Sequence, residues 1–334
     1  MITLCNQIES ANVIHKTRLR NCRLNTAASL VQPLFEGPID IVGDIHGEID
    51  ALHDLLGQLG YADDGSHTEG RRLVFVGDLA DRGPDSPAVI DVVKRLIQAE
   101  HAQCVLGNHE LNILRGDRKH DNHWFFGEEW SLDGSNAITP AVLADESIRS
   151  SVTAFFETLP LALEREDLRV VHACWDQAMI EIARSAADAC SLYSRCKNQI
   201  DADHNARQKM DAIERGIEHQ NRNAVKVLTS GVERRVTTPF QSSGKLRFQE
   251  RVPWWEGYGD DQPFCVFGHY SLPKDKRRSS PQSHCVDYGV AKRWLERATP
   301  GFDGSYQLRL AAVRFPERIV IFDDGSSDQV ENEQ

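Results

Sequence analysis

Hydrophobic and polar positions alternate in blocks from residue 39 onward. Short apolar runs, typical of buried strands, occupy 39–42, 72–77 and 103–107. Each run is followed by a segment with apolar residues every three to four positions, typical of an amphipathic helix, at 48–60, 86–100 and from about 109. This alternation predicts βαβ units around a buried sheet, with the carboxyl ends of the strands as the place for ligands.

The pattern changes after residue 145. We expect a helix over 147–160 and then strands at 161–164, 168–173, 264–268, 284–289, 306–313 and 318–322. Between them, residues 176–226 are polar and helix-prone, and we expect them to form an inserted helical cap that covers a site rather than forming core. The chain therefore divides into three expected segments, namely an extension over 1–38, a main domain over 39–325 and a solvated tail over 326–334.

Composition narrows the class of protein. The 334 residues are 40% hydrophobic and carry a formal charge of −12, so the chain as a whole would repel duplex nucleic acid and anionic membranes. Neither a membrane-spanning run nor a signal-peptide core is visible, and we expect a cytoplasmic protein. Eight cysteines without a Cys-x-x-Cys pair favour buried free thiols in a reducing compartment.

The first strand leads directly into "VGDIHG", which places Asp44 and His46 in a turn between glycines. Asp44 could cap the following helix, because an Asp side chain accepts the free N–H groups of a first helical turn. Alternatively, both side chains could be metal ligands at a strand end. This motif alone leaves both interpretations open.

The next two strands end in the same way, which strengthens the metal hypothesis. "VGDLADRGPDS" carries Asp78, Asp81 and Arg82, and "LGNHE" carries Asn108, His109 and Glu110. Any one of these could be a set of turn residues, but three successive strand ends with acid and imidazole neighbours favour ligation. Two later apolar runs lead into His172 and His269, which alone would be ordinary core histidines and which in this company become candidate ligands.

Together, Gly-Asp-x-His-Gly, Gly-Asp-x-x-Asp-Arg-Gly and Gly-Asn-His-Glu resemble the signature of the calcineurin-like metallophosphoesterases. Within that superfamily the chain is similar to the branch of Ser/Thr protein phosphatases and bacterial diadenosine tetraphosphatase-like enzymes, in motif order from about 39 to 325. The resemblance implies an α/β fold, a four-layer α/β/β/α sandwich of two mixed sheets flanked by helices. It also implies a metal-dependent phosphoric ester hydrolase.

The resemblance implies a role for each motif residue. Asp44, His46 and Asp78 would hold one divalent ion, and Asp78, Asn108, His172 and His269 a second, with Asp78 bridging. A hydroxide between the ions would attack phosphorus in line. The mixed oxygen and imidazole ligands suit Mn²⁺, with Fe or Zn²⁺ as alternatives.

Three further residues would act in catalysis, and a fourth would support the site. His109 would be the general acid, Asp81 would hold its imidazole, and Arg82 would grip the phosphate oxygens, although Asp81 and Arg82 could instead form a plain ion pair. Glu110 is expected to support the loop by hydrogen bonds rather than bind metal. Arg234 or Arg235 could add a second phosphate-binding guanidinium, or be a solvated basic pair.

One motif departs from many members of the superfamily. His269 is followed by Tyr270 and Ser271, so the second histidine of Gly-His-x-His is missing and the first ion has fewer protein ligands. The aromatic segment 117–130 could wall a substrate pocket or be a structural cluster. The expected substrate is a phosphoprotein, a dinucleoside polyphosphate or a small phosphoester. Symmetrical diadenosine tetraphosphate hydrolysis and a non-catalytic metal-binding scaffold are the alternatives.

Overall fold

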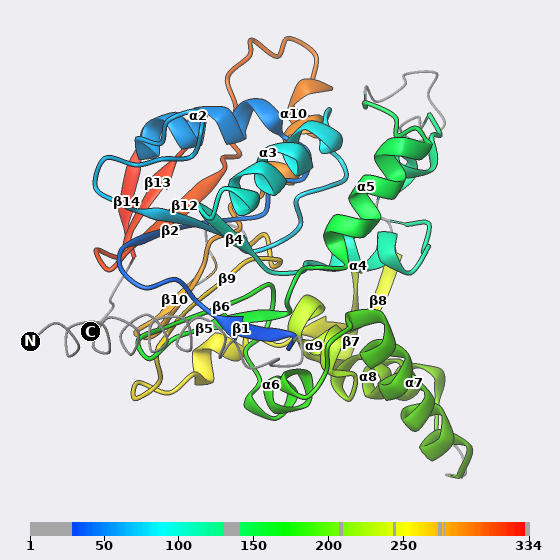
Figure 1. The fold of residues 1–334 in the computed structure, drawn as a ribbon. Coiled ribbons are helices and arrows are strands. Elements are labelled where there is room, and N and C mark those ends of the chain that lie inside the picture. The colour runs from blue at the N-terminus through cyan, green and yellow to red at the C-terminus, as the bar shows by residue number, and fades with distance from the viewer. Residues whose placement is uncertain are drawn as a thin grey trace, which may run out of the picture.

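The computed structural model of the chain describes residues 29–119, 121–129, 141–206, 210–242, 245–272, 276 and 278–330. Within these residues the strands form two six-stranded sheets and a separate hairpin (Figure 1). In spatial order, one sheet contains β14 (Ser327–Gln329), β13 (Ile319–Phe322), β12 (Ala311–Phe315), β2 (Ile39–Val42), β3 (Arg72–Phe75) and β4 (Ala102–Cys104). The other contains β1 (Val31–Pro33), β5 (Ala162–Glu164), β6 (Leu168–Val171), β9 (Phe264–Phe267), β11 (Ser283–Cys285) and β10 (Ser279–Ser280).

The predicted βαβ units are confirmed. Strands β2, β3 and β4 pair in parallel, with α2 (Ile49–Leu59) and α3 (Ser86–Gln98) as the intervening helices. Helix α2 ends at Gly60, whose φ of 89° closes the last turn in the left-handed conformation that glycine favours. Helix α3 begins after Asp85, whose side chain accepts the N–H of Ala88. The carboxyl ends of the three strands therefore meet at one edge of the sheet.

A hydrophobic layer lies between the two six-stranded sheets. One sheet contributes Ile39, Ile41, Val74 and Val76 to this layer, and the other contributes Leu168, Val170, Phe264 and Val266. The alternate residues of the strands, such as Val42 and Phe75, belong to a second cluster that includes the buried face of α2. Two mixed sheets packed face to face and flanked by helices form the expected α/β/β/α sandwich.

The segment 176–226 forms α6 (Gln177–Arg184), α7 (Ala189–Ala206), α8 (Ala212–Asn221) and the start of α9 (Ala224–Ser230). The expectation that this segment stays out of the core is wrong for α6 and α9. Ile180 and Ala183 of α6 and Ala224 and Val225 of α9 are fully buried in the main core cluster. Each of these two helices has a short apolar face that packs on the sandwich. In α8, by contrast, Gln220 is the only buried residue.

The remaining elements connect these layers. They are α4 (Asn108–Leu114), a 3-10 turn over Asn122–Phe126, α5 (Glu146–Phe156), the hairpin of β7 (Glu233–Ser242) and β8 (Lys245–Arg251), 3-10 turns over Trp254–Gly257 and Val290–Lys292, and α10 (Arg293–Arg297). The expected strand at 306–313 is shifted, because β12 begins only at Ala311.

The expected boundaries at residues 39 and 325 stay predictions. Strand β1 pairs with β5 before the first boundary, and the edge strand β14 pairs with β13 after the second. Residues 1–28 and 331–334 of the expected extension and tail lie outside the described part. The six cysteines within that part are free thiols. None of the helices described there is both long and apolar enough to cross a bilayer.

Candidate metal centre

The predicted ligands follow strand ends of both sheets. Asp44 and His46 follow β2, Asp78 follows β3, Asn108 follows β4, His172 follows β6 and His269 follows β9. All but Asn108 are buried, with at most 9% of the residue exposed. The structure therefore brings residues that are as much as 225 positions apart in the sequence into one buried cluster, as the contact between Asp44 and His269 shows.

Asp78 lies at the middle of this cluster. Its Oδ2 atom is 3.4 Å from Nε2 of His172 and 3.7 Å from Nε2 of His46. Two ligands bound at about 2.1 Å to one tetrahedral ion lie about 3.4 Å apart, so these separations suit donor atoms around a shared metal. Asp78 has an imidazole on either side, His46 and His172. A carboxylate that bridges two metal ions requires such further ligands on both sides.

Backbone carbonyls fix the orientation of two of the imidazoles. Nδ1 of His46 is 3.0 Å from the carbonyl oxygen of Ala80, and Nδ1 of His172 is 2.7 Å from that of Val76. A carbonyl oxygen only accepts, so Nδ1 is the donor in each ring and Nε2 is directed toward Asp78. Such support of the far ring nitrogen is typical of metal-binding histidines.

His269 provides a further test of whether a metal fits. Its Nε2 atom is buried and has no hydrogen-bond partner in the part of the chain that the structure describes, which is costly unless a ligand occupies it. The backbone N–H of His269 donates to Oδ2 of Asp44 at 3.0 Å, and this oxygen lies 3.9 Å from Nε2 of His46. Asn108 Oδ1 is 3.2 Å from Nε2 of His172. The donor set of carboxylate, amide and imidazole thus fits borderline divalent ions.

Two close approaches in the centre require glycine. A Cβ atom on Gly268 would lie 2.0 Å from Oδ1 of Asp44, and one on Gly107 would lie 2.3 Å from Oδ1 of Asp78. Both carboxylates are thus held against backbone that carries no side chain. Gly107 and Gly268 therefore have a steric reason for lacking a side chain.

Electrostatics in the cluster centre on buried carboxylates. Burial raises the pKa of Asp44 well above its usual range, and the nearby Asp287 raises it further. Burial would also raise the pKa of Asp78, but the charges of His172 and His109 hold it well below its usual range. Burial lowers the pKa of His172, yet the adjacent Asp78 carboxylate raises it to about 10. Negative charge here attracts a proton to an imidazole, and would equally attract a cation.

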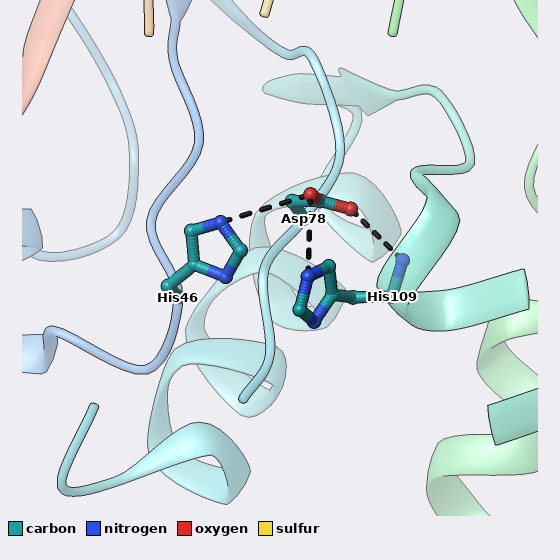
Figure 2. A group of neighbouring side chains, drawn as sticks. All are labelled: His46, Asp78 and His109. Atoms are coloured by element: carbon teal, nitrogen blue, oxygen red, sulfur yellow. Dashed lines mark hydrogen bonds and ion pairs between the residues drawn. The ribbon is translucent and has the colours of Figure 1, made fainter. Parts of the chain in front are cut away.

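His109 lies beside the same carboxylate but has a partner of its own. Its Nδ1 is 2.5 Å from Oδ2 of Asp81, and its Nε2 is 3.9 Å from Oδ2 of Asp78. Figure 2 shows Asp78 between His46 and His109, with the backbone N–H of His109 also donating to it. The predicted pair of His109 and Asp81 is thus present, and the same position brings His109 within reach of a metal at Asp78.

Trp124 is a site residue that sequence reasoning missed. Its indole N–H donates to Oδ1 of Asp81 at 2.6 Å, and the side chain is buried. The backbone N–H of Asp81 donates to Ser86 Oγ, so this aspartate is held on three sides. The aromatic segment 117–130 was the only signal, and it indicated a wall or a cluster rather than a partner of Asp81.

The arginines near the cluster have different partners. Arg82 faces Asp121 at 3.7 Å rather than pairing with its neighbour Asp81, and its side chain is 27% exposed. On the hairpin, Arg234 forms an exposed ion pair with Glu250 of β8. Arg235 forms one with Asp211, which precedes α8. Arg251, at the end of β8, instead donates to the carbonyl oxygen of His269 at 3.4 Å. Its position before "VPWW" gave no signal in the sequence.

Glu110 has the supporting role expected of it. One carboxylate oxygen accepts the N–H groups of Asp78 and Gly107, at 2.8 and 3.0 Å. The other accepts those of Leu79 and Ala80, at 2.9 and 3.3 Å. The expectation of loop support is confirmed, because one side chain satisfies four backbone donors of two adjacent turns.

Comparison with known proteins agrees with this geometry. Residues 37–173 match the family model described as calcineurin-like phosphoesterase. The chain is similar to bis(5'-nucleosyl)-tetraphosphatase PrpE [asymmetrical] of Geobacillus sp. strain WCH70, with 36% identity over 40% of this chain and 56% of the relative. The protein of the same name from Anoxybacillus flavithermus is 38% identical over 40% of this chain and 55% of its own length. The chain thus spans little more than half of these relatives.

Among solved structures, the chain is similar to a cold-active protein-tyrosine phosphatase of a Shewanella species. That likeness has a TM-score of 0.49 and 14% identity, over 90% of this chain and 82% of the other. The three strand-end motifs, at residues 42–47, 76–86 and 106–110, all lie within the matched segment 37–173. Over that matched segment, the chain is similar to the calcineurin-like phosphoesterase family.

Proposed function

We propose that this chain is a phosphoester hydrolase that requires two divalent metal ions, most favourably Mn²⁺. Asp44, His46 and Asp78 would hold one ion, and Asp78, Asn108, His172 and His269 the other. The observation that carries the proposal is the position of Oδ2 of Asp78, 3.4 Å from His172 and 3.7 Å from His46. When bound, two such ions supply positive charge to phosphoryl oxygens and an acidified water for in-line attack.

The protein's own residues would then act on the leaving group and the phosphate. His109 would donate the proton that the leaving oxygen needs, with its ring held by Asp81 and, through Asp81, by Trp124. Arg82 is only partly occupied by Asp121, and its guanidinium suits phosphate oxygens. Arg251 is the better second guanidinium than Arg234 or Arg235, since it contacts the backbone of His269.

We propose a dinucleoside tetraphosphate as the substrate. The support is the printed name of the relatives, bis(5'-nucleosyl)-tetraphosphatase [asymmetrical], over the segment that contains the three strand-end motifs. Asymmetrical cleavage yields a nucleoside triphosphate and a nucleoside monophosphate. Symmetrical cleavage would yield two nucleoside diphosphates, so the products identify the phosphorus that is attacked.

The test is a substrate panel on the purified full chain with Mn²⁺. The panel contains diadenosine tetraphosphate, a phosphoserine peptide and p-nitrophenyl phosphate, with products separated by chromatography and bound metal measured by elemental analysis. We expect about two ions per chain, fastest turnover of the tetraphosphate, and ATP with AMP as products. Two ADP would refute asymmetrical cleavage, and faster turnover of the peptide would refute the substrate.

The variant Asp78→Asn tests the metal centre. It keeps the shape of the side chain and removes the central charge, so we expect loss of at least one ion and of hydrolysis. Asp91→Asn is the matched control, because Asp91 is an exposed carboxylate on α3 that pairs only with Arg95 among the described residues. Full metal content and normal turnover in Asp78→Asn would refute the assignment. Bound metal in the unmodified chain without hydrolysis of any ester would favour a non-catalytic scaffold.

A further inference from the structure

A small basic pocket opens beside the loop that carries His269. Its volume is about 220 Å³, and the cationic side chains that line it are Arg278, Lys292 and Arg309. Most of the remaining wall consists of Tyr288, Gly289, Ser271 and two leucines. Among the described residues, the lining contains no carboxylate. In a chain with a formal charge of −12, three cations without a lining acid are a local reversal of charge.

Two of these cations have no carboxylate partner within the described part of the chain. Arg278 donates to the backbone carbonyls of Asp287 and Leu272 and stacks 4.1 Å from the centre of the Tyr288 ring. Lys292 is exposed at the end of a 3-10 turn, and no ion pair joins it to any described residue. Arg309 is partly neutralised by Asp324 at 3.5 Å. The pocket therefore keeps a net positive charge.

Ser271 provides an independent sign of a ligand. Its hydroxyl is buried and has no hydrogen-bond partner among the described residues, and its backbone has an unfavourable φ of 44°. Gly289 keeps the space beside that hydroxyl open, because a Cβ atom there would lie 3.1 Å from Ser271 Oγ. A buried hydroxyl without a partner is costly. A strained backbone that holds it in place is typical of binding sites.

The pocket lies close to the proposed metal centre. Ser271 is two residues after His269, and two residues span at most about 7 Å. If the metal ions hold one phosphate of a polyphosphate chain, the next phosphate or the one after it would therefore reach the pocket. The volume of 220 Å³ is below the range of sites for drug-sized ligands, so the pocket suits phosphate groups rather than a whole nucleotide.

We propose that Arg278, Lys292, Arg309 and the hydroxyl of Ser271 form an anion subsite for phosphate groups of the substrate other than the one attacked. The proposal rests on the proposed function for its substrate, a polyphosphate chain longer than one phosphate. Such a subsite distinguishes a dinucleoside polyphosphate from a phosphomonoester, because only the former has further phosphates to place there. Its chemistry is that of cations and a hydroxyl donor facing phosphate oxygens.

A titration without turnover tests the subsite by itself. Pyrophosphate is titrated into the full chain by calorimetry in the presence of a chelator. Without metal ions, the buried carboxylates of the centre repel the anion, so binding reports the subsite alone. We expect one site per chain. Lys292→Gln, an exposed substitution, should weaken pyrophosphate about tenfold, and Ser271→Ala three- to tenfold. Lys94→Gln, which removes a partly exposed lysine of α3 outside the pocket, should leave the affinity unchanged.

Kinetics with two substrates complete the test. For Lys292→Gln we expect KM for diadenosine tetraphosphate to rise about tenfold, kcat to stay within twofold, and both constants for p-nitrophenyl phosphate to be unchanged. Equal pyrophosphate affinity in Lys292→Gln and the unmodified chain, or an equal rise in KM for both esters, would overturn the subsite. A chain that hydrolyses neither ester would refute the proposed function alone, because the titration needs no turnover.

Discussion

At the scale of single residues, the site is marked by strained backbone. Six residues of the three motifs and the loop that carries His269 have positive φ, namely His46, Asp78, Asp81, Arg82, His269 and Ser271. None is a glycine, and such conformations cost about 1–3 kcal/mol each unless surrounding structure imposes them. Here Glu110 and the carbonyls that orient the imidazoles provide that structure. The strained backbone therefore indicates that the directions of these site side chains are kept at a cost in folding stability.

His109 is the residue whose role the geometry leaves between two alternatives. Its Nε2 lies 3.9 Å from Oδ2 of Asp78, close to the 3.7 Å of His46, so either a metal ligand or a general acid would occupy this position. Its short contact with Asp81 favours the general acid, because an oriented proton donor needs a fixed ring.

The variant His109→Asn separates these roles. A general acid should be removed without loss of metal, and kcat should fall by about 10²–10⁴ for a poor leaving group, far more than KM rises. The loss should be much smaller for p-nitrophenyl phosphate, because its phenolate needs little protonation. Metal analysis and kinetics with an alkyl and a nitrophenyl ester measure both effects. His53→Asn, at an exposed histidine of α2, is the control, and an emptied metal site would identify His109 as a ligand.

Residue types at this site could be predicted from the sequence, and their partners only in part. Asp44, His46 and Asp78 stood out because acid and imidazole side chains followed predicted strand ends. Trp124 and Arg251 did not. Trp124 contacts Asp81 and Arg251 contacts His269, and no sequence pattern indicates that these distant residues meet. Hydrogen-bond partners across the fold depend on packing, which a single sequence does not specify.

At the scale of elements, two turns of the sheet edge are joined by one carboxylate. Glu110, in the first turn of α4, accepts two N–H groups through each oxygen, from the loop after β3 and from the turn after β4. The parallel register of β3 and β4 places these turns side by side. The position of Asp78 and that of Asn108 are thus coupled through a residue whose two carboxylate oxygens both accept backbone N–H groups.

The variant Glu110→Gln should therefore destabilise the fold. A glutamine amide keeps one accepting oxygen and turns its NH₂ group toward two backbone donors, so we expect the free energy of unfolding to fall by about 3 kcal/mol. Urea denaturation followed by circular dichroism measures the change. Glu157→Gln, at an exposed position at the end of α5, should change it by less than about 0.5 kcal/mol. A similar effect of both variants would contradict the coupling.

Strands and helices with strong periodicity were predictable, and the segment 176–226 shows the limit. Its overall polarity predicted a cap, yet α6 and α9 each bury a short apolar face that an average over the segment conceals. Similarly, the apolar run expected as a strand over 103–107 ends at Cys104 in β4, because its last residues turn toward the site. Composition averaged over a segment is thus less informative than the face of each helix.

At the scale of the whole molecule, the sandwich joins the two halves of the centre. Asp44, His46, Asp78 and Asn108 come from one sheet, and His172 and His269 from the other, so the site exists only when both sheets are packed. Two dications would add four positive charges to a chain with a formal charge of −12, at the place where carboxylates are buried. Metal binding and the stability of the whole domain should therefore be linked.

This linkage predicts a rise in melting temperature with metal. A ligand that binds only the folded chain stabilises it by about 2.7 kcal/mol at a hundredfold excess over its Kd. For a chain of this size we expect Tm to rise by about 5 °C between chelator and saturating Mn²⁺. Ca²⁺ should raise Tm less at the same concentration, because it prefers all-oxygen ligands over imidazoles. Scanning calorimetry measures each shift. Asp78→Asn should lose most of the Mn²⁺ effect, and an undiminished shift in that variant would mean that the stabilising ion binds elsewhere.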